Sequence, residues 1–259
     1  MRRNSAEHLK RKEIETYSRL ECSEKPPYGY WWSRRLFKLL SDAERALVDI
    51  WANSYLKNKR CLILGCGGGG DLLSLNGLAN EIVGIDISDK QIYKAAKIVK
   101  DAHLVVCDAE ILPFRRNSFE AVFCKAILHH LPNLSKALVE IKYALKDNGI
   151  LFIGGEPGIL NLIAAIGRRF FPSRAHTPGE RPFIFSVLRR QIKATGFAEL
   201  RVAFFHLISH GLALKIMNIL LGENVLRKLI LKLLLENSLS RSFLKNLYWV
   251  MIAVYRKRL

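Results

Sequence analysis

The sequence is poor in the features that define several large classes of protein. It has 5 cysteines in 259 residues and no CxxC pair, so neither a disulfide framework nor a paired-thiol metal site is expected. No uncharged apolar run reaches the roughly 18 residues of a membrane-spanning helix. The N-terminal segment lacks the apolar core of a signal peptide, and we find no internal repeat. These absences favour a folded cytoplasmic protein with reduced thiols.

Acidic residues are scarce toward the C-terminus. The chain has 41 Lys and Arg against 23 Asp and Glu, a formal net charge of +18. Residues 160–259 hold 17 basic and 4 acidic residues, whereas residues 61–159 hold 10 and 11. Because the excess is concentrated outside the middle of the chain, we expect the basic flanks to face an anionic or acidic partner.

From residue 60 onward, short apolar runs alternate with segments of helical spacing. Such alternation predicts a parallel sheet that is covered by helices on both faces. The strands are expected at 61–64, 82–87, 103–107, 119–124, 150–154, 200–207 and 248–255.

The chain divides into an arm and one domain. A basic and aromatic arm is expected over residues 1–40, and the domain over 41–259. Within the domain we expect a core over 60–157, a substrate loop with a helical lid over 158–247, and a last strand over 248–257.

The strongest local signal is the run LILGCGGGGD at residues 62–71. A strand leads directly into glycines, which permit a tight turn and the close approach of a ligand, and a helix with free N–H groups follows. Gly65, Gly67 and Gly70 fit the dinucleotide pattern GxGxxG, which is weak on its own. Asp86 lies 21 residues after Gly65, at the end of the next strand, where a carboxylate can accept both hydroxyls of an adenosine ribose. The loop and the acid together predict an adenosine-cofactor site, with a helix-capping acid as the alternative for Asp86.

Asp108, at the end of the third expected strand, distinguishes two adenosine cofactors. An acid there can receive the adenine amino group, a contact that a nicotinamide-dependent oxidoreductase does not need. A surface turn is the alternative for Asp108, and the oxidoreductase is the alternative for the protein.

Five segments then carry a resemblance to a known family: LILGCGGGG, IVGIDIS, VVCDAEILPF, NSFEAVFCKAILHHL and LKDNGILFIGGEP. In order and spacing they resemble the class I S-adenosylmethionine-dependent methyltransferases, in particular the group with the methyltransferase type 11 domain. The resemblance covers about residues 60–157 and is specific for cofactor and reaction type but not for substrate. It implies S-adenosyl-L-methionine as the cofactor and S-adenosyl-L-homocysteine as the product.

The resemblance also implies an α/β fold, a Rossmann-like three-layer sandwich. Its seven-stranded sheet would be mostly parallel with an antiparallel last strand. An N-terminal helical arm would precede the sheet, and a helical insertion would precede the last strand.

Cofactor-binding residues follow from the same resemblance. Asp86 would bind the ribose, and Asp108 would meet the adenine edge. The implied set is Gly65, Cys66, Gly67, Gly69, Asp86, Ile87, Asp108, Ala109 and Lys125. The family usually has an acid two residues before the first glycine, where this chain has Ile63. This departure leaves open a weakened site, a replacement by Glu156 or water, or a domain without activity.

Polar residues follow the fourth and fifth expected strands. Ligands in open α/β sheets bind at the carboxyl ends of the strands, so His129, His130 and Glu156 are candidates for acceptor contact or general base. His130 is the stronger of the two histidines, and a capped turn with one packed and one solvated histidine is the alternative. No set of His, Cys, Asp and Glu has metal-ligand spacing, so no metal is expected.

A loop over residues 172–182 is rich in His, Pro, Gly and Arg and can close over a substrate. We expect substrate contacts from this loop and from the N-terminal arm, at Trp31, Trp32, His176, Glu180 and Arg181. A surface loop pinned by an internal Glu–Arg pair is the alternative.

Two apolar, basic helices are expected near 212–221 and 224–236. They would cover an apolar acceptor site, rest on anionic lipid at the membrane surface, or pack on the core with solvated lysines. Nucleic acid is a less favoured partner, because aromatic and basic residues do not alternate as in a stacking platform. We therefore expect a methyltransferase for a small-molecule or lipid- or glycan-like, anionic acceptor. The alternatives are an RNA methyltransferase and a non-catalytic module that binds an adenosine ligand, a membrane surface or a partner protein.

Overall fold

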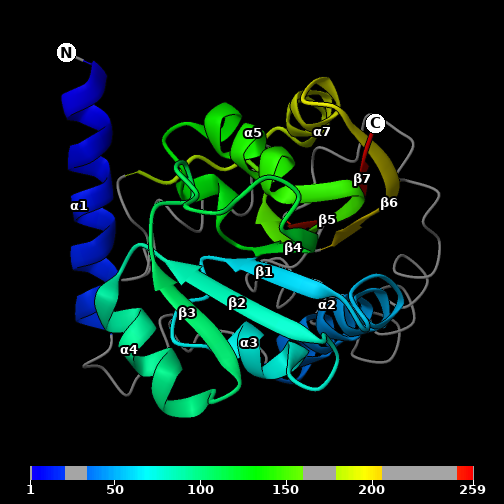
Figure 1. The fold of residues 1–259 in the computed structure, drawn as a ribbon. Helices are drawn as coiled ribbons and strands as arrows, with labels where there is room; N and C mark the ends of the chain where they lie inside the picture. Colours follow the sequence, from blue (N-terminus) through cyan, green and yellow to red (C-terminus); the bar gives the residue numbers. More distant parts are fainter. Residues whose placement is uncertain (1, 21–33, 160–178, 206–249, 259) are drawn as a thin grey trace, which may run out of the picture.

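A computed structural model of the chain describes residues 2–20, 34–159, 179–205 and 250–258 (Figure 1). The helices are α1 (Arg2–Leu20), α2 (Arg34–Tyr55), α3 (Gly70–Leu75), α4 (Asp89–Ile98), α5 (Leu134–Ala144) and α7 (Phe185–Ala194), with a 3₁₀ turn η1 (Leu128–His130). The strands are β1 (Arg60–Leu64), β2 (Glu81–Asp86), β3 (Ala102–Val106), β4 (Phe119–Lys125), β5 (Leu145–Pro157), β6 (Phe197–Phe205) and β7 (Val250–Lys257).

The seven strands form one sheet in the order β3-β2-β1-β4-β5-β7-β6. Strands β1 to β5 pair in parallel, and β7 runs antiparallel to both β5 and β6. The predicted fold, a seven-stranded, mostly parallel sheet with an antiparallel last strand, is confirmed. The strand order reverses between β1 and β4, and ligands bind at the carboxyl ends of strands beside such a switch point.

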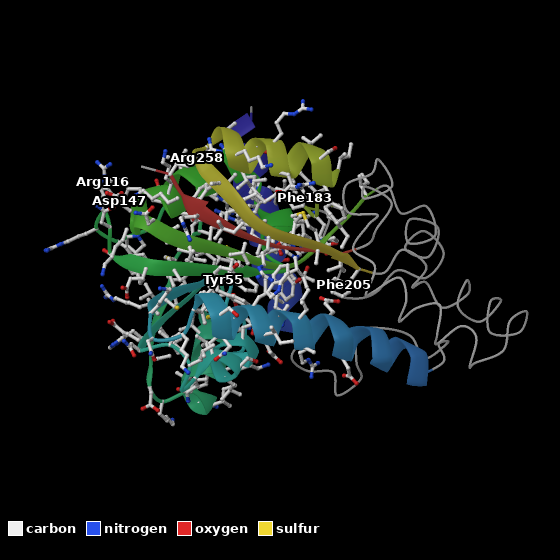
Figure 2. The ribbon with its side chains drawn as sticks, turned by 90° about the vertical axis from the view of Figure 1, so that its right-hand side faces the viewer. Tyr55, Arg116, Asp147, Phe183, Phe205 and Arg258 are labelled. Carbon is white, nitrogen blue, oxygen red and sulfur yellow. The ribbon has the colours of Figure 1, made fainter. Side chains whose placement is uncertain are left out.

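Helices cover both faces of the sheet, which makes the fold a three-layer sandwich (Figures 1 and 2). Strand β1 shows why, because its successive side chains point to opposite faces. Cys61 and Ile63 pack in the core with α2, α3 and α4, whereas Leu62 and Leu64 pack in the core with α5 and α7. A strand that is apolar at every position is buried on both sides, as the sequence pattern predicts.

Local signals set the starts of two helices that border the carboxyl ends of the strands. Ser88 is the N-cap of α4, and its hydroxyl accepts a hydrogen bond from the backbone N–H of Gln91 at 3.4 Å. Asn133 is the N-cap of α5, and its side-chain oxygen accepts from the N–H of Lys136 at 3.1 Å. Such caps satisfy backbone donors that the first helical turn leaves unpaired.

Some expectations concern segments beyond these elements. Helix α2 runs continuously through residues 40 and 41, where the arm was expected to end. The expected helical insertion at 212–236 lies outside the described residues. Among the described helices, none has both the length and the apolar character needed to cross a membrane.

Candidate functional site

A cavity of about 350 Å³ opens at the carboxyl ends of β1, β2 and β4. The sheet contributes the loops that follow these strands, and α1 contributes a further wall. The lining residues are Lys10, Glu13, Ile14, Tyr17, Gly65, Gly67, Gly68, Ile85, Asp86, Ile87, Ser88, Gln91, Cys107, Asp108, Ala109, Ala126, Ile127, His130, Leu131 and Pro132. The cavity is large enough for a cofactor-sized ligand.

The glycine loop forms the floor of the cavity. Gly65 has φ +63°, and a Cβ there would lie 2.7 Å from Cδ1 of Ile127. Gly67 has φ +50°, and its N–H donates to Oδ2 of Asp86 at 3.0 Å. The loop therefore needs glycine both for its left-handed backbone and for its close contact with the loop after β4.

Asp86 links the glycine loop to the start of α4. Its Oδ2 accepts from Gly67, and its Oδ1 accepts from the N–H of Ser88 at 2.9 Å. Burial raises the pKa of this carboxyl above its usual 3.8, and the two backbone donors oppose that rise. A partly buried carboxylate at a cavity wall is suited to accept hydrogen bonds from ligand hydroxyls, because these would restore the solvation that burial removes.

Asp108 lies on the same wall, after β3. Its Oδ1 accepts from the N–H of Glu110 at 2.9 Å, which holds the carboxylate in a tight turn. Its Oδ2 lies 2.6 Å from Nζ of Lys10, and Oε2 of Glu110 lies 2.8 Å from the same ammonium. Burial lowers the pKa of Lys10, but the hydrogen bonds that its ammonium donates to the two carboxylates, together with their charges, outweigh burial and raise the pKa overall.

Helix α1 supplies one wall of the cavity, which was not predicted from the sequence. Lys10, Glu13, Ile14 and Tyr17 all line the cavity. They recur at helical spacings of three, four and seven residues, so they lie along one face of the helix. That spacing is the signal by which this wall could have been found in the sequence. The backbone carbonyl of Tyr17 accepts from Nε2 of Gln91 at 3.5 Å, which ties α1 to α4.

Glu156, a candidate for acceptor contact or general base, lies in the core behind the turn of the two histidines. Its side chain is completely buried and accepts from the backbone N–H groups of Ile127, Leu128 and His129 at 3.0, 3.0 and 3.3 Å. It also lies 2.9 Å from Nδ1 of His129. Burial raises the pKa of Glu156, but the hydrogen bond and charge of His129 and the backbone donors outweigh it and lower the pKa overall. Glu156 therefore holds in place the turn η1 that carries the two histidines, the histidine turn, and does not line the cavity.

The two adjacent histidines differ in position. His130 lines the cavity, whereas His129 lies behind it and does not. The ring centroids are 4.0 Å apart. Oε1 of Glu13 lies 2.6 Å from Nδ1 of His130, and the hydroxyl of Tyr17 lies 3.3 Å from its Nε2. Of the two histidines, His130 is therefore the one with access to the cavity, and its catalytic role stays a prediction.

Several residues implied by the family resemblance lie away from the cavity. Lys125 turns to Asp71, with Nζ 2.7 Å from Oδ1, and Cys66 is buried beneath the glycine loop. Neither they nor Gly69 line the cavity, whereas the other implied residues Gly65, Gly67, Asp86, Ile87, Asp108 and Ala109 do. Ile63 is completely buried in β1 and does not line the cavity either.

The expected substrate loop is described only from Gly179 onward. The N–H of Arg181 donates to the carbonyl of His129 at 2.8 Å, and Nη1 of Arg181 lies 3.4 Å from the carbonyl of Pro132. Glu180 lies beside the two histidines. These hydrogen bonds hold the segment against the histidine turn, but Glu180 and Arg181 do not line the cavity itself. Trp31, Trp32 and His176 lie outside the described residues.

The sequence of this chain is similar to those of known methyltransferases. Residues 62–153 match the family described as "Methyltransferase domain". A stretch of 146 residues is 30% identical to the ubiquinone biosynthesis O-methyltransferase of Glaesserella parasuis and covers 52% of this chain. The match spans 61% of that relative, less than two thirds of its length.

Solved structures show the same fold at low identity. The N-methyltransferase NodS of Bradyrhizobium japonicum, in complex with S-adenosyl-L-homocysteine, gives a TM-score of 0.59 at 13% identity, over 95% of this chain and 98% of NodS. The [4+2]-cyclase SpnF gives a TM-score of 0.56 at 20% identity, over 83% of this chain and 82% of SpnF. Because one neighbour is a cyclase by name, the fold alone does not define the reaction.

Proposed function

We propose that this chain, whose residues 62–153 form a class I S-adenosylmethionine-dependent methyltransferase domain, transfers a methyl group to a small-molecule or lipid-like acceptor. The family predicted from the sequence is confirmed by this match. One observation carries the proposal: the glycine loop, Asp86 and Asp108 come from three neighbouring strands and line a single cavity that His130 also lines.

The residues present fit the cofactor that the family implies. S-Adenosylmethionine has an amino acid end, a ribose with two hydroxyls and an adenine with an exocyclic amino group. The loop at Gly65 and Gly67 leaves room for close backbone approach, because a side chain at Gly65 would meet Ile127. Asp86 would accept from the ribose hydroxyls and Asp108 from the adenine amino group, each with a carboxylate on the cavity wall.

The cofactor supplies, when bound, a methyl group on a positively charged sulfur. The chain mainly contributes orientation and the exclusion of water. Helix α1 covers the cavity and shields it from solvent. Because His130 lies on the cavity wall, we assign to it the transfer of a proton from an acceptor hydroxyl. Glu13, 2.6 Å from Nδ1 of His130, would orient the ring.

The cavity lining and the relatives both support this acceptor class. Apolar side chains from α1 and the histidine turn, Ile14, Ile127 and Leu131, line the cavity, which favours an acceptor with an apolar body. Similar proteins include one named an O-methyltransferase of ubiquinone biosynthesis and one named a sterol 4-C-methyltransferase. The 17 basic residues of 160–259 favour an acidic group on the acceptor or contact with an anionic membrane surface.

Calorimetric titration of the full chain with S-adenosylmethionine and S-adenosylhomocysteine tests the cofactor assignment. We expect saturable binding that Asp86→Asn weakens at least tenfold, while Asp89→Asn, three residues further on and exposed, leaves it unchanged. Transfer of labelled methyl to apolar phenols, anionic lipids, glycans and RNA then identifies the acceptor. Folded protein that binds neither compound would refute the proposal, and transfer to RNA alone would replace the acceptor class.

A further inference from the structure

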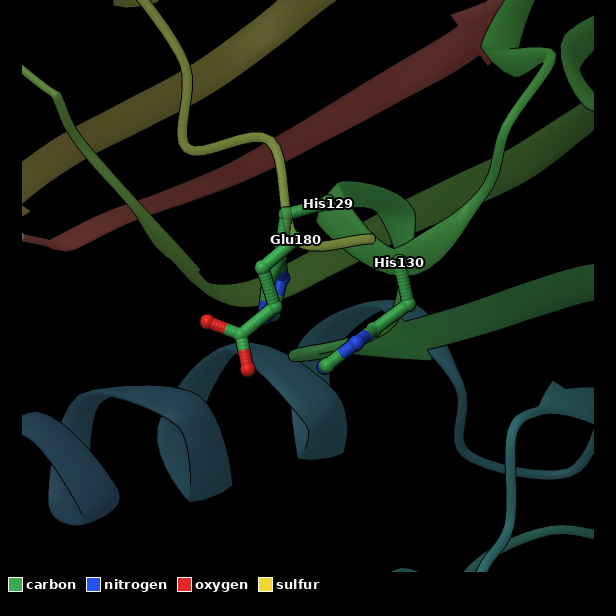
Figure 3. A group of neighbouring side chains, drawn as sticks. All are labelled: His129, His130 and Glu180. Atoms are coloured by element: carbon green, nitrogen blue, oxygen red, sulfur yellow. The ribbon is translucent and has the colours of Figure 1, made fainter. Parts of the chain in front are cut away.

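Three side chains with metal-binding chemistry meet beside the cavity. One donor atom from each of His129, His130 and Glu180 lies within 4.8 Å of the other two. Figure 3 shows the pair of histidines on the turn after β4 and Glu180 arriving from the segment before α7. We propose that these three residues bind a first-row divalent cation, with Zn²⁺ as the expected biological ion. None of them belongs to the expected cofactor contacts, so cation binding does not rest on the proposed methyl transfer. With a cation bound, the free ring nitrogen of His130 is a ligand and no longer the proton acceptor assigned to it above.

The fold holds the two halves of this site together. The backbone N–H next to Glu180, that of Arg181, donates to the carbonyl of His129 at 2.8 Å. The segment of Glu180 is therefore hydrogen-bonded directly to the histidine turn. Zinc donors lie about 2.0–2.2 Å from the ion, so three donor atoms that lie within 4.8 Å of one another must move closer together to share one ion.

His129 is oriented as a metal-binding histidine usually is. Its Nδ1 lies 2.9 Å from the buried carboxylate of Glu156. With Nδ1 engaged in this way, the ring keeps its proton on Nδ1, and Nε2 is left as the ligand nitrogen. A carboxylate that holds the other nitrogen of a ligating histidine fixes the ring and raises its basicity.

The ring of His130 is held against Glu13 of α1. Its side chain is 7% exposed, and Oε1 of Glu13 lies 2.6 Å from its Nδ1. At this separation the ring proton belongs on Nδ1, where it faces the carboxylate. The lone pair of Nε2, which lies 3.3 Å from the hydroxyl of Tyr17, is then the one that can bind a cation.

The chemistry of the three ligand atoms favours some metal ions over others. Two imidazoles and one carboxylate suit Zn²⁺, Co²⁺ and Ni²⁺, whereas Mg²⁺ and Ca²⁺ prefer oxygen ligands throughout. Each ring has a carboxylate at its Nδ1, that of Glu156 for His129 and that of Glu13 for His130. Three protein ligands leave a coordination position for water or for an oxygen of another molecule. Because His130 lines the cavity, that position would be at the acceptor end of the site.

Cobalt titration of the untagged, metal-stripped full chain tests this inference. We expect one equivalent of Co²⁺ to bind with the visible absorption bands of a low-coordinate ion, and Zn²⁺ to displace it while Mg²⁺ does not. His129→Gln and Glu180→Gln are expected to weaken Co²⁺ binding at least thirtyfold. Glu156→Gln is expected to weaken it by about 10–100-fold, as for other partners of metal-bound histidine.

His103→Ala is the matched control, because this histidine is 74% exposed and lies 3.9 Å from Glu81, far along the chain from the turn. Its variant should bind Co²⁺ as the parent does. Glu180 lies on a partly exposed loop, so Glu180→Gln should fold normally by circular dichroism. Absence of saturable Co²⁺ binding would overturn the inference, and so would binding that survives both His129→Gln and Glu180→Gln. Titration of the same variants with S-adenosylmethionine tests the proposed function separately.

Discussion

Nζ of Lys10 lies 2.6 Å from Oδ2 of Asp108, so an ammonium of the first helix contacts the carboxylate that is expected to meet the adenine edge. The two residues are 98 positions apart in the chain. The same ammonium also pairs with Glu110. Together these contacts fasten α1 across the cavity and make Lys10 part of the site.

Replacing Lys10 with methionine should loosen α1. The substitution keeps a long side chain but removes both partly buried ion pairs, so local opening of the helix should become easier by about 1 kcal/mol. Amide hydrogen exchange in α1 should then be about fivefold faster. Lys12→Met, at an exposed position of the same helix, is the control. Equal exchange in the two variants would show that the ion pairs do not hold the helix.

Alanine at Gly65 should impair both binding and stability. The residue has φ +63°, and its new Cβ would lie 2.7 Å from Ile127. Gly77 has a similar φ of +76° but open space around it, so Gly77→Ala isolates the backbone strain of about 1–2 kcal/mol. We expect Gly65→Ala to lose more stability in urea than Gly77→Ala, and to lose cofactor affinity at least tenfold. A similar loss in both variants would mean that strain alone matters.

Cofactor affinity should fall in acid because of Asp86. Its pKa is raised above 3.8, chiefly by burial, and ligand hydroxyls donate best to the ionised form. Above the raised pKa the carboxylate is charged and affinity is independent of this group; below it, affinity should drop about tenfold per pH unit. Calorimetry across the acidic range checks this. Asp86→Asn should bind weakly with a flat profile, and a slope retained in that variant would assign the dependence to another group.

Glu156→Gln should destabilise the protein by about 2–4 kcal/mol. The amide keeps one acceptor oxygen, but its NH₂ would face backbone donors that then stay unsatisfied in the core. Glu7→Gln, at an exposed position of α1, should cost almost nothing. Urea unfolding of the two variants measures the difference, and equal midpoints would contradict the structural role of Glu156.

The pKa of Glu156 also predicts how stability changes with pH. Its pKa in the folded protein is lowered from the usual 4.5, so the folded state favours the charged form. The stability from this group is therefore complete above about pH 4.5 and is lost as the pH falls through the lowered folded value. The difference in unfolding free energy between the parent and Glu156→Gln should shrink over that acidic range. A constant difference would contradict the assignment.

Local sequence was sufficient for the parts of the site that depend on one strand and its next turn. The glycine run after Leu64 and the acid at Asp86 could be predicted, because a strand end, a tight turn and a helix start are encoded by neighbouring residues. Lys125, which was expected to line the pocket, depends instead on a residue that is distant in the sequence. Its position after β4 is local, but its direction depends on Asp71, 54 residues away.

The sequence alone determined the sheet, its two-sided burial and the loop for an adenosine ligand, since these follow from apolar periodicity and backbone freedom. Only the tertiary structure decided which polar groups meet. It places the ammonium of Lys10 against the carboxylate of Asp108, buries Glu156 against His129, and brings Glu180 close to both histidines. Each pairing joins residues from separate elements, where no spacing rule operates, and charge and burial act through space. A metal site that no sequence spacing indicates can therefore be assembled by the fold.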